Sequence, residues 1–298
     1  MSSEHRVVQR EVARIDNPKA VAGHMTGHRA RRLIDGSDTA FTDPFLLMAE
    51  DWMPNGAFAL HPHRGIETVT FVIEGAVEHF DSGGHHGRLE EGDAQWMTAG
   101  RGVQHEENAP NGTIAHTLQI WVNLPARDKM TEPRYQDLAS ADMPVRHEPG
   151  VEARVFSGLS GDVASTTANH VPVTMIDARI QPGANFRHEL PGTDNAFLFV
   201  LDGTVVVGSS GIIVHAGELA WLTQIENVVS EILLVATAEL GRVLIFSGRP
   251  VKENVVFGGP FVMNSQEEIR QPLPTIALVG SDRTSSICHA NGRAAATK

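Results

Sequence analysis

The feature that most constrains this fold is an internal repeat. Residues 71–77 (FVIEGAV) match residues 199–205 (FVLDGTV), and residues 91–97 (EGDAQWM) match residues 216–222 (AGELAWL). The two blocks recur in the same order and at nearly the same offset along the chain. Two copies of one structural unit are the simplest explanation, and a chain of 298 residues is long enough for two domains.

Each copy reads as short strands joined by glycine turns. Residues 68–73 are rich in β-branched and aromatic side chains, Glu74-Gly75 is a hairpin turn signal, and Gly92-Asp93 precedes a further strand. Closely spaced strands of this kind are typical of sandwiches and barrels. We therefore predict an all-β fold of two fused β-barrels with little helix. One helix is predicted over residues 265–271, where Ser265 and Glu268 form a capping-box pattern.

The repeat also predicts how the chain is divided. We place a metal-binding barrel in residues 1–130 and a second barrel without metal ligands in residues 131–279. The boundary is expected within the charged, proline-containing stretch 124–149. Residues 280–298 are small, polar and without periodicity, so we predict a disordered tail there.

The composition argues against nucleic-acid and membrane roles. With 24 Lys+Arg and 36 Asp+Glu, the formal net charge is −12, which repels a polyanion; the basic cluster at residues 29–32 is interpreted as a solvated face. No run approaches the ~18 apolar residues of a membrane helix, and the N-terminus lacks the apolar core of a secretory signal. Cys288 is the only cysteine, which excludes an intrachain disulfide and a Cys-based zinc site. We expect a cytoplasmic location, or a nuclear one in a eukaryote, and no direct nucleic-acid or membrane partner.

Two pairs of polar residues carry the predicted chemistry. His61 and His63 are two residues apart, as are His105 and Glu107, so each pair projects from one face of a strand. If the two segments face each other inside one barrel, three imidazoles and one carboxylate converge on a single metal ion. Nitrogen ligands with one carboxylate suit Fe(II), Mn, Ni, Cu or Zn and leave coordination positions open for oxygen or substrate.

The remaining histidines provide the competing interpretation. The chain has 15 His, so chance pairs are expected. His85 and His86 are adjacent in a glycine-rich loop and cannot share a strand face, and we interpret His79 and His116 as ordinary strand residues. Two pairs at barrel-compatible positions are much harder to explain by chance.

The second copy serves as an internal control for the predicted metal site. At the positions that correspond to the four predicted ligands it carries Glu189, Pro191, Ser230 and Ile232. A requirement of the fold alone would not place imidazoles in one copy only. We therefore expect the second barrel to be structural, or to shape the entrance to the first.

Longer blocks of sequence resemble the pirin family. These blocks are residues 43–45, 61–70, 95–102, 118–125 and 258–264, and the similarity extends over roughly residues 6–271. The resemblance implies two cupin-type barrels, a bicupin, with one Fe(II) ion in the N-terminal barrel. The family's ligands fall on His61, His63, His105 and Glu107, while Glu67 is expected to orient a neighbour of the metal rather than bind it.

The resemblance implies more than one kind of function. Some bacterial pirins are quercetin 2,3-dioxygenases, so one hypothesis is a dioxygenase that opens a flavonol such as quercetin with O₂, with Glu107 as the catalytic base. Other pirins bind transcription factors or metabolic enzymes, so the alternative is a regulatory protein whose iron senses redox state. A third possibility is that the metal only joins two strands and another small molecule is the substrate.

Overall fold

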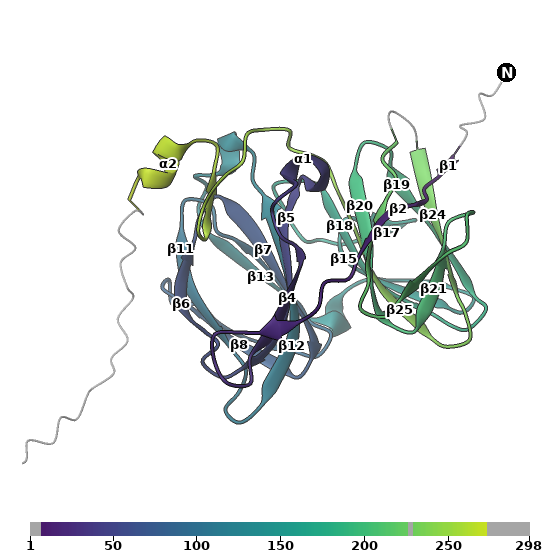
Figure 1. The fold of residues 1–298 in the computed structure, drawn as a ribbon, viewed down its shortest axis with the longest axis horizontal. Helices are drawn as coiled ribbons and strands as arrows, with labels where there is room; N and C mark the ends of the chain where they lie inside the picture. Colours follow the sequence, from purple (N-terminus) through teal and green to yellow (C-terminus); the bar gives the residue numbers. More distant parts are fainter. Residues whose placement is uncertain (1–6, 226–228, 273–298) are drawn as a thin grey trace, which may run out of the picture.

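The computed structural model describes residues 7–225 and 229–272, whose strands form two β-barrels side by side (Figure 1). In the first barrel a large sheet has the strand order β13-β10-β7-β12-β5-β4-β3, and a smaller sheet has the order β6-β11-β8-β9. Their bounds are β3 (Val21–Ala22), β4 (Arg29–Ile34), β5 (Phe45–Pro54), β6 (Phe58–His63), β7 (Ile66–Glu74), β8 (Ala76–Asp81), β9 (His86–Glu90), β10 (Ala94–Thr98), β11 (Val103–Asn108), β12 (Ile114–Asn123) and β13 (Arg134–Leu138).

The second barrel repeats this arrangement. Its large sheet has the order β14-β15-β18-β25-β20-β23-β2, and its smaller sheet contains β1, β24, β21 and β22, with β19 also pairing with β24. Their bounds are β1 (Val8–Gln9), β2 (Val12–Asp16), β14 (Val145–Glu148), β15 (Val151–Ser157), β18 (Val173–Ile180), β19 (Asn185–Pro191), β20 (Asn195–Asp202), β21 (Thr204–Val207), β22 (Ile212–His215), β23 (Leu219–Leu222), β24 (Val229–Ala236) and β25 (Gly241–Gly248).

Few other elements accompany the barrels within the described residues. They are the small pairs β16 (Leu159–Ser160) with β17 (Val163–Ala164) and β26 (Val256–Gly258) with β27 (Phe261–Met263), the helices α1 (Thr39–Thr42) and α2 (Gln266–Arg270), and the 3₁₀ turns η1 (Ala126–Asp128) and η2 (Ser140–Asp142). The predicted all-β fold with little helix is confirmed. So is the capped helix, because the Ser265 side chain accepts a hydrogen bond from the Glu268 amide. No helix in this part of the chain is long and apolar enough to cross a membrane.

The repeated sequence blocks occupy equivalent places in the two barrels. The first block forms the β7–β8 hairpin and its copy forms the β20–β21 hairpin. The turn glycines have positive φ, 84° at Gly75 and 72° at Gly203, which favours glycine. Trp96 on β10 and Trp221 on β23 are both buried. The internal repeat is therefore a repeat of structure.

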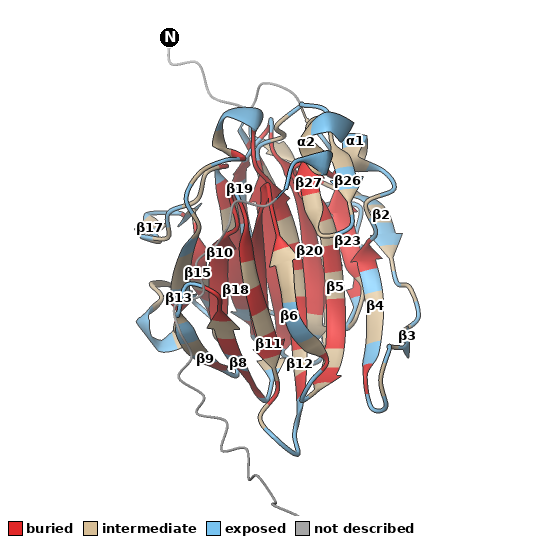
Figure 2. Cartoon of the chain, turned by 90° about the vertical axis from the view of Figure 1, so that its left-hand side faces the viewer, coloured by how far each residue is buried: buried red, intermediate tan, exposed pale blue. Residues whose placement is uncertain are grey.

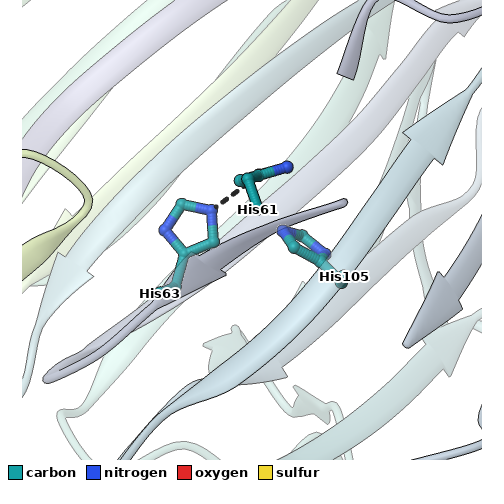
Figure 3. Close-up of side chains that lie close together, drawn as sticks. All are labelled: His61, His63 and His105. Atoms are coloured by element: carbon teal, nitrogen blue, oxygen red, sulfur yellow. Dashed lines mark hydrogen bonds between the residues drawn. The ribbon is translucent and has the colours of Figure 1, made fainter. Parts of the chain in front are cut away.

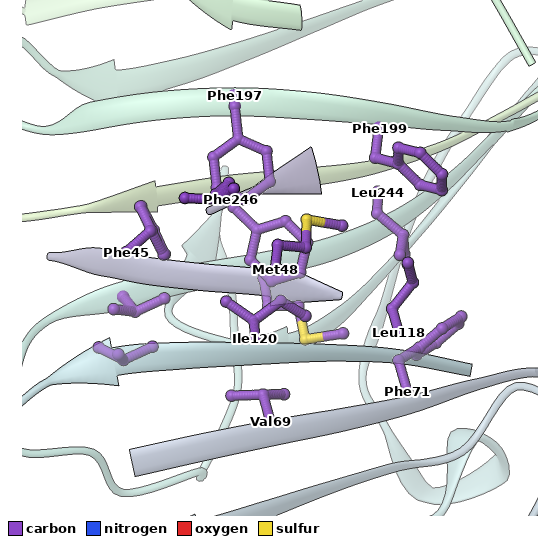
Figure 4. Close-up of a cluster of buried hydrophobic side chains, with 14 of the residues drawn as sticks. Phe45, Met48, Val69, Phe71, Leu118, Ile120, Phe197, Phe199, Leu244 and Phe246 are labelled. Carbon is purple, nitrogen blue, oxygen red and sulfur yellow. The ribbon is translucent and has the colours of Figure 1, made fainter. Parts of the chain in front are cut away.

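The two barrels share one apolar core. Buried side chains from β5, β7 and β12 of the first barrel pack against side chains from β20 and β25 of the second (Figure 4). The ring of Phe45 meets Phe197 edge-on at 5.0 Å, and Phe197 stacks on Phe246 at 4.9 Å. Figure 2 shows buried residues running along the central strands while exposed residues lie in the loops and outer strands. Because the large sheets face each other, the interior of the first barrel lies on the opposite face of the same strands.

The strand pairing differs from the predicted division of the chain in three places. β1 and β2 lie near the N-terminus but pair with β24 and β23 of the second barrel. β13 lies beyond residue 130 but pairs with β10 of the first barrel. The C-terminal segment returns to the first barrel, where Arg64 donates to the Glu268 carbonyl at the end of α2. β2 and β13 each extend a large sheet at its edge, so the strands of the two barrels are not separated by one boundary in the sequence. The predicted disordered tail, residues 280–298, lies outside the described residues.

Candidate metal centre

The site begins with the pairing of two neighbouring strands. β6 runs antiparallel to β11, and His61 lies directly opposite His105 in the ladder. The ring centroids of His61 and His105 are 4.5 Å apart, those of His61 and His63 are 4.9 Å apart, and those of His63 and His105 are 5.0 Å apart. Figure 3 shows the three imidazoles turned toward a common point. Each offers a nitrogen within 4.8 Å of the others.

Glu107 lies beside this triad rather than within it. A β-bulge between His105 and Glu107 shifts the register, so Glu107 faces Phe58 across the ladder. One carboxylate oxygen accepts from the Thr70 hydroxyl at 2.7 Å, and the other accepts from the Gln119 amide at 2.6 Å. The carboxylate is within 4.8 Å of ring nitrogens of both His105 and His79. Two overlapping groups of possible ligands therefore share His105.

His79, which we predicted to be an ordinary strand residue, also lies at this cluster. It lies on β8 opposite Glu107, is buried, and contacts the His105 ring at a centroid distance of 5.2 Å. The alternation of residues along β8 could have indicated this position, because Val77, His79 and Asp81 follow at every second position and are all buried. His116, by contrast, bonds Glu50 at 2.7 Å and stacks on Trp52, as expected of an ordinary strand residue.

The protonation state of the cluster suits metal binding. Burial lowers the pKa of His63 and of His105 well below the ordinary value, and the nearby imidazoles lower both further; burial also lowers the pKa of His79. These rings are therefore neutral near pH 7. The Nδ1 of His61 lies 2.9 Å from the Ala59 carbonyl, which can only accept, so Nδ1 is the donor of this hydrogen bond and Nε2 is the ring nitrogen turned toward the cluster.

The ring nitrogens without hydrogen-bond partners also favour a metal site. Within the described residues, neither ring nitrogen of His79 or His105 has a hydrogen-bond partner, nor does Nδ1 of His63, although all are buried. The Nε2 atoms of His61 and His63 approach each other at 3.1 Å. Buried polar atoms are normally hydrogen-bonded, and a cation at the cluster would take up one nitrogen of each ring that binds it. The residues present fit a divalent transition metal.

A cavity of about 300 Å³ adjoins the cluster inside the first barrel. Alternate residues of β4, β5 and β12 line it, and Thr70 of β7 and Glu107 of β11 form part of its wall. Two aromatic residues connect it to the imidazoles: Trp121 contacts the His63 ring at 5.2 Å and Phe58 contacts the His61 ring at 6.2 Å. A larger cleft of about 860 Å³ lies around Asp43 and Asn195, but none of the cluster residues lines it.

Comparison with known proteins identifies the family. Residues 27–122 match the family described as Pirin, and residues 175–274 match the Pirin C-terminal cupin domain. Pirin-like protein 2 of Arabidopsis thaliana is 40% identical over 248 residues, which cover 82% of this chain and 77% of that protein. The chain belongs to the pirin family. The resemblance seen in the sequence is thereby confirmed, as are the two cupin barrels.

Solved structures of similar proteins agree with this assignment. The crystal structure of GK1651 from Geobacillus kaustophilus has a TM-score of 0.82 and 45% identity, covering 84% of this chain and all (100%) of that one. Quercetin 2,3-dioxygenase from Acinetobacter baumannii has a TM-score of 0.76 and 31% identity, covering 88% of this chain and 94% of that one. The similarity to both extends over most of the chain.

Within this pirin fold, Glu67 has a different place from the one expected. Its strand, β7, turns Thr70 toward the metal centre but turns Glu67, Val69 and Phe71 toward the second barrel. The Glu67 carboxylate accepts from the Thr98 hydroxyl at 2.7 Å, and burial raises its pKa. The residues that orient a predicted ligand are instead Thr70 and Gln119.

Proposed function

We propose that the chain is a mononuclear iron dioxygenase that acts on a flavonol such as quercetin. The observation that carries the proposal is the cluster of three imidazoles, two of them buried, beside an aromatic-lined cavity that also contains Glu107. The similarity to the Acinetobacter baumannii quercetin 2,3-dioxygenase supports this choice of substrate class.

The proposed ligands of one Fe(II) ion are His61, His63, His105 and Glu107. When bound, the metal would supply Lewis-acid and O₂ chemistry at the end of the cavity. The protein contributes a fixed ligand geometry, because β11 is paired with β6 on one side and with β8 on the other. It also excludes water, since His63, His105 and Glu107 are all buried.

The carboxylate of Glu107 is the proposed catalytic base. Each of its oxygens accepts one hydrogen bond, from Thr70 or from Gln119, and each retains a second acceptor site. Gln119 is itself held by the Trp121 indole, which donates to its side-chain carbonyl at 3.2 Å. Glu107 is therefore positioned to accept the hydroxyl proton of a phenolic substrate in the cavity.

The experiment combines metal analysis with an aerobic flavonol assay. Purified protein is expected to hold one metal per chain and to consume O₂ with quercetin. His63→Ala should lose both metal and turnover, whereas His116→Ala, outside the cluster, should keep both. Full metal occupancy of the wild type without O₂-dependent turnover would exclude the dioxygenase.

An iron-dependent regulatory protein is the second candidate. The formal net charge of −12 favours a basic face on a protein partner, such as a transcription factor or a metabolic enzyme. In that case the oxidation state of the iron would control binding. Capture of a partner by the Fe(II) form and not by the Fe(III) form, with no flavonol turnover, would favour this candidate over the dioxygenase.

A further inference from the structure

A buried His–Asp pair lies in the wall of the cavity that contains Glu107. The Nε2 of His28 is 2.9 Å from Asp51 Oδ1, and the two side chains are only 5% and 8% exposed. Both residues line the cavity, together with Glu107 and Phe58. The His28 ring is fixed edge-on against Phe58 at 5.5 Å. Neither His28 nor Asp51 is a proposed metal ligand.

The alternation of β5 explains why Asp51 faces the cavity. Leu47, Ala49, Asp51 and Met53 follow one another at every second position and all line it. The intervening Glu50 points away, where Arg31 and His116 pair with it. Two adjacent buried carboxylates on one strand therefore have different surroundings, one at the cavity and one outside it.

Asp51 retains acceptor capacity toward the cavity. In residues 7–225 and 229–272, His28 is the one side chain that bonds its carboxylate, and it does so at Oδ1. A carboxylate has about four acceptor sites, so Asp51 can accept further hydrogen bonds from a group in the cavity. Burial raises the pKa of Asp51, the His28 partner opposes this, and the nearby Glu107 charge adds to it. A hydroxyl donor in the cavity would satisfy Oδ2.

We propose that the His28–Asp51 pair binds a second hydroxyl group of the aromatic substrate, distinct from the one that meets Glu107. This inference rests on the proposed dioxygenase function and deepens it. Glu107 and Asp51 are both acceptors, and apolar and aromatic side chains such as Met53, Phe58 and Trp121 lie among them. The cavity therefore selects a planar aromatic molecule with hydroxyl groups at separate positions, and discriminates against one that carries a single hydroxyl.

The test compares two flavonols that differ in their ring hydroxyls, quercetin and 3-hydroxyflavone. Their dissociation constants are measured with the iron-loaded protein under anaerobic conditions, where no turnover occurs. The wild type is expected to prefer quercetin. In Asp51→Ala, quercetin binding should weaken by about tenfold or more, the loss typical of a hydrogen bond to a charged group, while 3-hydroxyflavone binding stays unchanged.

Glu50→Gln is the matched control, because Glu50 is the neighbouring buried carboxylate on β5 but lies outside the cavity. It should leave the preference for quercetin intact. Should Asp51→Ala fail to fold, Asp51→Asn preserves the side-chain shape and should still reduce the preference severalfold. Iron content is measured for every variant, so that loss of metal is separated from loss of recognition.

The outcomes distinguish a failure of the His28–Asp51 role from a failure of the proposed dioxygenase function. A preference for quercetin that is unchanged in the folded Asp51 variants, or absent from the wild type, overturns the role of the pair and leaves the dioxygenase standing. Failure of iron-loaded wild type to bind either flavonol overturns the proposed function, and this inference with it.

Discussion

The side-chain amide of Gln119 donates to Glu107 Oε2 at 2.6 Å, so a residue on β12 fixes the orientation of a predicted ligand on β11. The Trp121 indole holds the other end of the same amide. This chain of contacts links the wall of the cavity to the metal centre through side chains alone.

Replacing Gln119 should therefore loosen Glu107. We expect Gln119→Ala to lower metal affinity or turnover by about 10-fold or more, since partners that orient metal ligands typically contribute this much. A chelator competition assay and O₂ uptake measure the two effects. Gln136→Ala is the control, because the Gln136 amide bonds the Ala168 carbonyl instead. Equal behaviour of the two variants would contradict the orienting role.

His79 should influence the metal without being required for it. His79→Ala leaves the three imidazoles of His61, His63 and His105 in place, so we expect one metal per chain with affinity reduced by about tenfold. His105→Ala removes the residue shared by both ligand groups and should abolish binding. Metal content after dialysis measures this. Complete loss of metal in His79→Ala would make His79 a required ligand and revise the proposed set.

His188 gives a prediction about pH and stability in the second barrel. Burial lowers its pKa to about 4, and the Arg146 charge contributes. The unfolded chain binds this proton near pH 6.5, but the folded chain does not, so the free energy of unfolding falls as the pH drops from about 6.5 to about 4. The contribution is about 3 kcal/mol at most.

Urea unfolding of wild type and His188→Gln between pH 7 and pH 4.5 measures that contribution. The variant should lose less stability on acidification than the wild type, because it lacks this group. Parallel stability curves for the two proteins would show that His188 is not buried in the neutral form.

Two turn glycines, Gly203 of the repeat and Gly112 between β11 and β12, should differ in their tolerance of a side chain. A Cβ at Gly203 would lie 2.3 Å from the Leu240 carbonyl oxygen, while at Gly112 it would meet nothing within 4 Å. Both have positive φ, 72° and 78°, so both should lose about 1–2 kcal/mol from the left-handed backbone alone. Gly203→Ala should lose clearly more than Gly112→Ala in thermal unfolding. Equal losses would mean that the backbone relaxes around the new methyl group.

The sequence predicted those features that depend on residues close together in the chain, such as turns, strands and pairs of side chains two positions apart. Glycine turns and strand signals indicated two barrels, and the two-residue spacing within each pair predicted that His61, His63 and His105 would converge if their strands came together; β6 and β11 are neighbours in one sheet. The sequence did not reveal His79, Thr70 or Gln119, because their place depends on which strands become neighbours and in which register. The bulge after His105 is also invisible to simple alternation, and it places Glu107 opposite Phe58 in the ladder.

The same limit applies to the His28–Asp51 pair. The two residues lie 23 positions apart, with β4 and α1 between them, and no short motif connects them. Only the alternation along β5 indicates that Asp51 shares a strand face with apolar residues such as Ala49 and Met53. A buried charge on such a face is a useful signal once the barrel interior is known.

The exchange of chain ends between the barrels has a consequence for how the molecule holds together. Residues 12–16 complete a sheet whose other strands begin after residue 144, and residues 261–270 lie against a barrel that is otherwise finished by residue 138. Each barrel therefore includes a segment from the opposite end of the chain. Expressing either half alone would leave its barrel incomplete. The two barrels are therefore expected to unfold in one cooperative transition, so a destabilising substitution in the second barrel should also weaken metal binding at the predicted site in the first.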